Sequence, residues 1–216
     1  AIAVFGGGFF AYQSVNAADI TGDAGVSYSD TRTFRGVKQA DDTLGVNVGL
    51  GTSLVEKVSL GVSLDSFTAL EGGQTNELRT GVSLGYDLSE TIGLSVGYTN
   101  YDYQSATSAD EIGFGVSFET VLSPSVLYAT DSDNDSDVTE LSVCHELSLS
   151  EQFGLTLCGS LGNVDAAADY TYHSIGATVT SSLGGADTFA GVALVDNDNA
   201  GSDSETVFSV GLSLAF

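Results

Sequence analysis

Hydrophobic and small polar residues alternate along most of this chain with a period of two. The last segment has the clearest pattern: Phe208, Val210, Leu212, Leu214 and Phe216 alternate with Ser209, Gly211, Ser213 and Ala215. Successive side chains of a strand point to opposite faces, so such a strand has one apolar face and one small or polar face. The polar face of a soluble sheet would carry long charged side chains. A polar face with almost no bulk is typical of a strand between lipid and a crowded or wet interior.

The same alternation recurs and predicts twelve strands, over residues 20–31, 42–53, 57–67, 76–87, 91–103, 109–119, 124–131, 137–149, 153–164, 170–182, 187–196 and 204–216. Short connections take turns with longer ones, so all the long connections lie at one end of an up-and-down meander. Because the number of strands is even, both chain ends lie at the short-turn end. Closure removes the exposed edges of an apolar sheet. We therefore predict an all-β fold, a single up-and-down antiparallel transmembrane β-barrel over residues 18–216.

Residues 1–17 do not follow this pattern. They form a short apolar run that ends in Val15-Asn16-Ala17, with small residues where a signal peptidase needs them. The run is too short to span a bilayer as a helix, which takes about 20 residues. We interpret it as the remnant of a secretory signal peptide, with the mature chain beginning near Ala18. The alternative is an N-terminal arm, or a plug segment inside the barrel.

Composition and charge exclude other classes of protein. Five Lys and Arg residues stand against 29 Asp and Glu residues, which gives a formal net charge of −24 and argues against a nucleic-acid partner. The mean hydropathy of +0.16 is higher than that of a disordered acidic protein. We expect the bacterial outer membrane as the location and its lipid as a partner. The amphipathic last strand, which ends on Phe216, predicts recognition by the barrel-assembly machinery.

The first hairpin carries a family resemblance. The segment Tyr28-Ser-Asp-Thr-Arg-Thr-Phe34-Arg35-Gly36-Val-Lys-Gln39 resembles the Y-x-F-R-G-x-x-Q opening of a bacterial outer-membrane family with conserved hypothetical or TorF-type names. In that family a loop and a Gly-rich strand follow, as residues 44–51 do here. The sequence departs from the family at residues 31–33, where a Tyr usually precedes Phe-Arg-Gly. The resemblance implies a fold and a location, because the family has no settled chemistry.

Three of the five basic residues, Arg32, Arg35 and Lys38, lie together in the predicted first long loop. One interpretation makes them a constriction or an anion contact. The other, which we favour, is that they pair with surrounding carboxylates and hold the loop inward, because opposite charges at a loop base commonly order it.

The inward face of the predicted barrel carries mainly Gly, Ser, Thr and Asn, with a few charged residues, namely Asp65, Arg79, Glu140 and Glu146. Barrels of about eight strands fill their interior, whereas barrels of roughly 16–18 strands leave a channel. Twelve strands with small inward residues should leave some water-filled space. We therefore expect a small passive, porin-like channel for small cations or solutes, with a preference for cations. The main alternative is a closed barrel that acts as a surface adhesin or an acidic coat.

Metal and catalytic sites have weaker signals. Acidic residues at every second position from Asp131 to Asp137 resemble the start of a calcium loop but lack its turn Gly and distal Glu, so weak divalent cation binding is the most we expect. His145 and His173 could each serve as a general base, and an outward-facing His145 keeps an outer-membrane lipase as a less favoured alternative. No nucleophile motif accompanies either histidine. No Cys and His spacing suggests zinc, and we expect no cofactor or metal.

Two cysteines flank a short turn. Cys144 and Cys158 are equidistant from Glu151, so a hairpin that closes symmetrically there brings them face to face on the lumen side. Opposed Cβ atoms lie about 4.5–5.5 Å apart, near the ~3.5–4.5 Å of a disulfide. Since a periplasmic folding route supplies the oxidant, we predict a disulfide. The alternative is a pair of unlinked thiols packed as small lumen residues.

Overall fold

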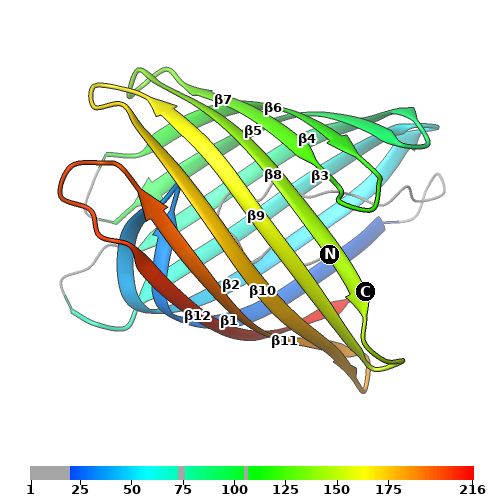
Figure 1. Ribbon diagram of the computed structural model, residues 1–216. Helices are drawn as coiled ribbons and strands as arrows, with labels where there is room; N and C mark the ends of the chain where they lie inside the picture. The colour runs from blue at the N-terminus through cyan, green and yellow to red at the C-terminus, as the bar shows by residue number, and fades with distance from the viewer. Residues whose placement is uncertain (1–19, 73–75, 105–106) are drawn as a thin grey trace.

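The computed structural model describes residues 20–72, 76–104 and 107–216, and the interpretation of residues 1–17 lies outside this range. The described residues form a closed barrel of twelve antiparallel strands in chain order, with β12 paired to β1 (Figure 1). The strands are β1 Ile20–Phe34, β2 Val37–Val55, β3 Val58–Ala69, β4 Glu77–Ser89, β5 Ile92–Tyr103, β6 Ala109–Phe118, β7 Ser125–Asp131, β8 Ser136–Ser148, β9 Phe153–Asp165, β10 Tyr170–Leu183, β11 Ala186–Asn197 and β12 Glu205–Ala215. All twelve predicted strands, and the predicted fold class, are confirmed.

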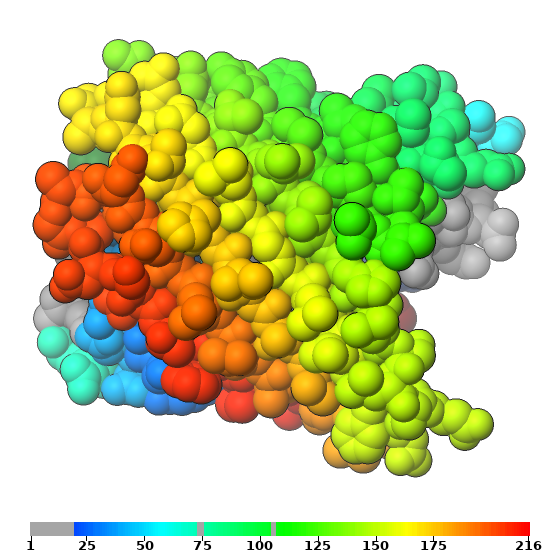
Figure 2. Space-filling view, in the orientation of Figure 1, coloured from blue at the N-terminus to red at the C-terminus, as the bar shows by residue number. Residues whose placement is uncertain are grey.

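The alternation of the sequence becomes the two sides of the barrel wall. Apolar residues such as Val210 and Leu212 are exposed on the outer surface, while Ser209 of the same strand is buried. Side chains of β9, β10 and β11 lie in diagonal rows across that surface (Figure 2). An apolar band around a closed antiparallel sheet is what a lipid bilayer requires, because the backbone groups are paired within the sheet. Within the described residues, no helix is long and apolar enough to cross a membrane.

The predicted alternation of short and long connections is confirmed only in part, because the β6–β7 connection, residues 119–124, is longer than the β7–β8 connection, residues 132–135, at the opposite end. The loops that connect β9 to β10 and β11 to β12 extend at one end, and the C-terminus lies at the other, with the short turns (Figure 1). At that end Phe216 is paired with β1, since its backbone N–H donates to the Gly22 carbonyl at 2.8 Å and its carbonyl accepts from Gly22 at 2.7 Å. The last residue is therefore part of the closing seam.

The first connection differs from the prediction of a long loop over residues 32–41. β1 continues to Phe34, β2 begins at Val37, and a two-residue turn of Arg35 and Gly36 joins them. Both turn residues have positive φ, 50° and 80°, which suits a tight hairpin turn. Arg32 and Lys38 thus lie in strands, because backbone pairing within the hairpin outweighs the polar, loop-like composition of this stretch.

β7 is the shortest of the twelve strands, with seven residues, so the neighbouring β8 extends beyond it. Its ladder with β8 ends at the pair Ser125 and Ser142, although β8 continues to Ser148. The β6–β7 connection covers part of the exposed edge: the backbone N–H of Cys144 donates to the Leu122 carbonyl at 2.9 Å. An unpaired edge would be costly in a membrane protein, so this contact replaces part of the missing ladder.

Candidate functional site

The end of the first hairpin leaves the barrel wall. The ladder of β1 with β12 ends at Ser29, and the ladder of β2 with β3 ends at Thr43. Residues 30–42, here called the hairpin end, are paired with each other beyond these points. A bulge at Gln39 and a left-handed backbone at Asp42, where φ is 43°, interrupt the regular strand geometry. Such irregularities bend a strand, and the hairpin end curls inside the ring of strands (Figure 1).

The contacts of the hairpin end reach walls on both sides of the lumen. Arg32 forms a salt bridge with Glu77 on β4, and Arg35 forms one with Glu111 on β6. In the other direction, the Asn197 side-chain amide on β11 donates to the Gly36 carbonyl at 2.6 Å. β6 is separated from β2 by β3, β4 and β5, whereas β11 is separated from β1 by β12. The hairpin end therefore crosses the lumen.

Aromatic rings surround the guanidinium groups of this cluster. The Arg79 Cζ lies 4.4 Å from the Phe34 ring centroid, 5.1 Å from that of Phe67 and 5.0 Å from that of Tyr101. The Arg32 Cζ lies 4.1 Å from the Phe67 centroid. Within about 6 Å a cation is attracted by the face of an aromatic ring, so Phe34 of the hairpin end stabilises the charge of Arg79 on β4, and Phe67 stabilises that of Arg32.

The side chains of this cluster are charged, yet they are almost completely buried in the lumen. Glu77 is 3% exposed, Glu111 is 5% exposed, and Arg32 and Arg79 are each 7% exposed. Glu77 accepts from both Arg32 and Arg79. Side chains thus fill the lumen at this level. Because a buried charge without a partner is strongly destabilising, the guanidinium and carboxylate groups depend on each other.

The other side of the lumen is filled by a second, mostly apolar cluster. Ala129, Val138, Val164 and Tyr172 pack together on the inner faces of β7 to β10. The Tyr172 hydroxyl donates to Glu140 at 2.6 Å. Tyr172 also packs against the turn of the first hairpin, because a Cβ at Gly36 would overlap its Cβ. Only a glycine fits this close approach, so Gly36 serves both the turn and the contact.

The structure brings together three of the predicted lumen residues, namely Arg32, Arg35 and Arg79, whereas Glu140 lies with the second cluster as the partner of Tyr172. Asp65 lies opposite Arg79 in the ladder of β3 with β4. Lys38 is half-exposed and pairs with Asp41 at 2.6 Å and Glu205 at 3.9 Å, so it does not join the cluster. Glu146 lies on β8 beyond the disulfide, toward the short turns, and is exposed.

Glu77 and Glu111 are not among the residues singled out from the sequence, although their carboxylates bind the three arginines of the lumen. Each lies near the start of its strand, at a position that shares the inward face with small residues further along. A charged residue on a face that otherwise carries Gly and Ser is a signal that could have found them. Phe34, Tyr101 and Tyr172 gave no such signal, because aromatic residues are common in strands.

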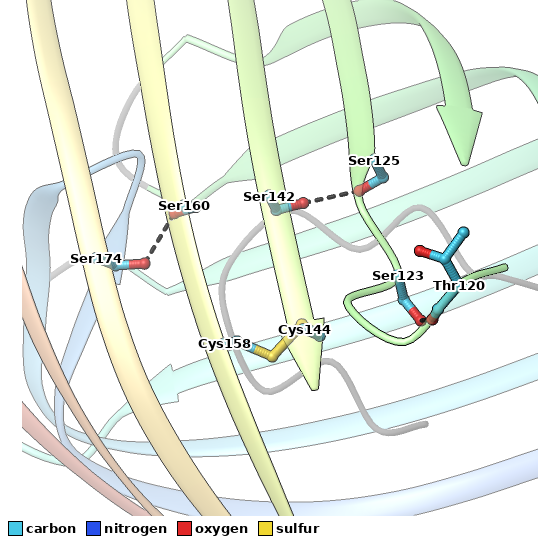
Figure 3. Close-up of a disulfide and its surroundings, with 8 residues drawn as sticks. All are labelled: Thr120, Ser123, Ser125, Ser142, Cys144, Cys158, Ser160 and Ser174. Carbon is cyan, nitrogen blue, oxygen red and sulfur yellow. Dashed lines mark hydrogen bonds between the residues drawn. A yellow bond between two sulfur atoms is a disulfide. The ribbon is translucent and has the colours of Figure 1, made fainter. Parts of the chain in front are cut away.

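The predicted disulfide is present. Cys144 and Cys158 are directly opposed in the ladder of β8 with β9, with their Cα atoms 4.2 Å apart (Figure 3). Pairs of serine hydroxyls flank it on the same inner wall: Ser125 with Ser142, and Ser160 with Ser174, each at 2.8 Å (Figure 3). The bridge lies two residues beyond the end of the β7 ladder, where β8 has lost its regular neighbour on one side.

The other sequence candidates have structural partners. Asp131 accepts hydrogen bonds from the backbone N–H groups of Asp133 and Asn134, so its carboxylate organises its own turn. Among the described residues, no group of three or more His, Cys, Asp or Glu side chains is placed to hold a metal ion. The His145 Nδ1 is hydrogen-bonded to the Val121 carbonyl at 2.8 Å, and the His173 Nε2 lies 3.9 Å from Asp196. The two histidines are thus in contact with a backbone carbonyl and with a carboxylate, respectively.

Comparison with known proteins gives structural matches alone. No protein-family model matches the chain, and no curated protein matches it. The solved KdgM porin superposes with a TM-score of 0.59 at 10% identity, over 91% of this chain and 99% of that one. The NanC porin gives 0.60 at 11% identity, over 88% and 98%. The COG4313 outer membrane channel from Pseudomonas putida F1 gives 0.59 at 10% identity, over 95% and 98%.

The fold is that of a bacterial outer-membrane β-barrel. Together with the apolar outer surface, this fold places the protein in the outer membrane. At such low identity the likeness extends to the fold alone. The resemblance of the first hairpin to the TorF-type family stays a prediction.

Proposed function

We propose that the protein is a small outer-membrane channel that prefers cations. Toward the short turns, the inward positions of β3 and β4 are small, among them Ser59, Ser63 and Ser83. Toward the long loops, the hairpin end and its partners fill the lumen. Among the described residues, the lumen lining is thus small toward the short turns and bulky at one level toward the long loops, and the residues at that level would decide what passes.

The observation that carries the cation preference is the pairing of the arginines. Every lumen guanidinium already has a carboxylate partner, since Arg32 and Arg79 share Glu77 and Arg35 binds Glu111. Further carboxylates lie on the inward face: Asp23 accepts from the Asn47 amide at 2.9 Å, Asp65 is opposite Arg79 in the ladder, and Glu140 accepts from Tyr172. Fixed carboxylates in excess of guanidinium groups raise the local concentration of cations and repel anions.

The same pairing argues against an acidic sugar as the solute. The KdgM porin has been solved in complex with disordered oligogalacturonate, whose sugar units carry carboxylates. A lumen that binds such a chain needs cationic groups that are available to it. Here buried glutamates hold the guanidinium groups. We infer that small cations and small neutral solutes are the substrates.

Reversal potentials of the refolded protein in a planar bilayer under a KCl gradient test the proposal. We expect a cation-selective potential that weakens as salt rises, because the Debye length falls from about 10 Å at 0.1 M to about 3 Å at 1 M. Asp23→Asn combined with Asp65→Asn should reduce the selectivity. Glu151→Gln, in a short turn outside the lumen, is the matched control and should leave it unchanged. Anion selectivity of the native protein would refute the proposal.

The closed barrel is a second candidate, favoured by the burial of the hairpin end. An acidic coat or adhesin needs no lumen, and its acidic loops would face outward in the same way. It predicts no ion current from the native protein or from any variant of the lumen cluster. The same bilayer recordings therefore separate the two functions.

A further inference from the structure

We propose that the hairpin end, residues 30–42, is a displaceable plug of the lumen, held shut by ion pairs to the wall. The inference rests on the proposed channel function. It adds that the narrow level is a movable part of the chain, and that native conductance is set by how often this part leaves the lumen.

The first step is that the hairpin end does not belong to the barrel wall. Ser29 is the last β1 residue in the ladder with β12, and Thr43 is the first β2 residue in the ladder with β3. The wall is therefore complete without residues 31–41. Moving them would break no inter-strand ladder of the closed barrel, so the membrane-spanning sheet could stay intact.

The second step is that the backbone has places to bend. Asp42 adopts φ 43°, and its carbonyl accepts from the Leu70 N–H at 2.8 Å, which is the last backbone contact with the β3 side. The bulge at Gln39 lies closer to the tip. Hinges are a few residues at the ends of elements that absorb changes in φ and ψ. Both irregularities lie between the wall and the tip.

The third step is that a few side-chain contacts hold the tip in place. Arg32 binds Glu77, Arg35 binds Glu111, and the Asn197 amide binds the Gly36 carbonyl. Each is a discrete, charge-assisted or side-chain hydrogen bond, unlike the continuous ladder of the wall. Losing one of them shifts the balance between inserted and displaced states, because the ratio changes tenfold for each ~1.4 kcal/mol.

The test is a charge swap across the lumen. Arg35→Glu and Glu111→Arg each place two like charges against one another, and the double variant restores an ion pair with reversed polarity. Lys57→Gln is the matched control, because Lys57 is an exposed cation in the short turn between β2 and β3, away from the hairpin end and its ion pairs to the wall. Heat-modifiable migration on a gel checks that each variant folds. Should the reversals prevent folding, Arg35→Ala and Glu111→Gln replace them.

A plug predicts that both single variants raise the mean bilayer conductance by roughly tenfold or more, that the double variant returns it toward the native level, and that the control leaves it unchanged. A fixed constriction predicts opposite changes, because Arg35→Glu makes the lumen more negative and Glu111→Arg makes it more positive. Opposite changes, or native conductance equal to that of both single variants, would overturn the plug and leave the channel intact. No conductance from any of these proteins would overturn the channel as well.

Discussion

Replacing both cysteines with serine should destabilise the barrel by an amount that the loop length sets. Cys144 and Cys158 are 14 residues apart in the sequence. A bridge that closes a loop of about 15 residues removes chain entropy from the unfolded state worth about 3 kcal/mol at 25 °C. The serines would lie on the same inner wall as the existing serine pairs, so the native state should lose little else. We expect the free energy of unfolding to fall by about 2–3 kcal/mol.

Unfolding in urea from lipid vesicles measures this loss. The sequence contains no Trp, so circular dichroism and heat-modifiable migration on a gel are the suitable signals. Ser125→Ala combined with Ser142→Ala is the matched control. It removes the neighbouring 2.8 Å hydrogen bond, worth about 1 kcal/mol, without changing the connectivity of the chain.

Two results would contradict the reasoning. Equal stability of the native protein and the serine variant, both unreduced, would mean that the bridge does not restrict the unfolded chain. Labelling of two thiols per chain in the unfolded, unreduced protein would mean that the bridge is absent.

The remaining predictions concern the lumen cluster and a loop. Glu77→Gln leaves two buried guanidinium groups without their carboxylate and should cost about 3–5 kcal/mol in urea unfolding, whereas Glu146→Gln, at an exposed position, should cost almost nothing. The pKa of Asp198 is lowered because the Thr171 backbone N–H and hydroxyl donate to its carboxylate. The stability that the ionised Asp198 carboxylate gives to the folded protein is therefore present above the ordinary aspartate pKa, and it is lost as the pH falls through the lowered pKa. Protection of the Thr171 amide from hydrogen exchange should therefore persist through the usual aspartate range, and loss of protection within that range would contradict this.

Sequence periodicity was sufficient for the barrel because lipid and lumen impose opposite demands on the two faces of every strand. The alternation of Leu141 and Val143 with Ser142 and Cys144 gives both the strand and its orientation. The disulfide followed from the same reasoning, since the register of a hairpin is a local property of its turn. These features involve residues that are close in the sequence, or a solvent that every strand meets.

The hairpin end could not be predicted in the same way. Its polar residues suit a loop as well as a strand, and its fold depends on the bulge at Gln39 and the bend at Asp42. The favoured interpretation of the basic residues, that they pair with carboxylates, agrees with the contacts of Arg32 and Arg35. Which carboxylates they bind could not be predicted, because Glu77 and Glu111 meet Arg32 and Arg35 only when the hairpin end crosses the lumen.

The disulfide also has a consequence for the accuracy of assembly. The outer faces of β8 and β9 are mainly apolar and their inner faces mainly small or polar, so a slip of two residues would keep the character of each face. Hydrophobic matching alone would penalise such a slip weakly. A bridge between Cys144 and Cys158 permits a single alignment, since a slipped pair would separate the two sulfur atoms. The disulfide therefore fixes the register of the β8–β9 hairpin, in which part of β8 has no ladder with the shorter β7.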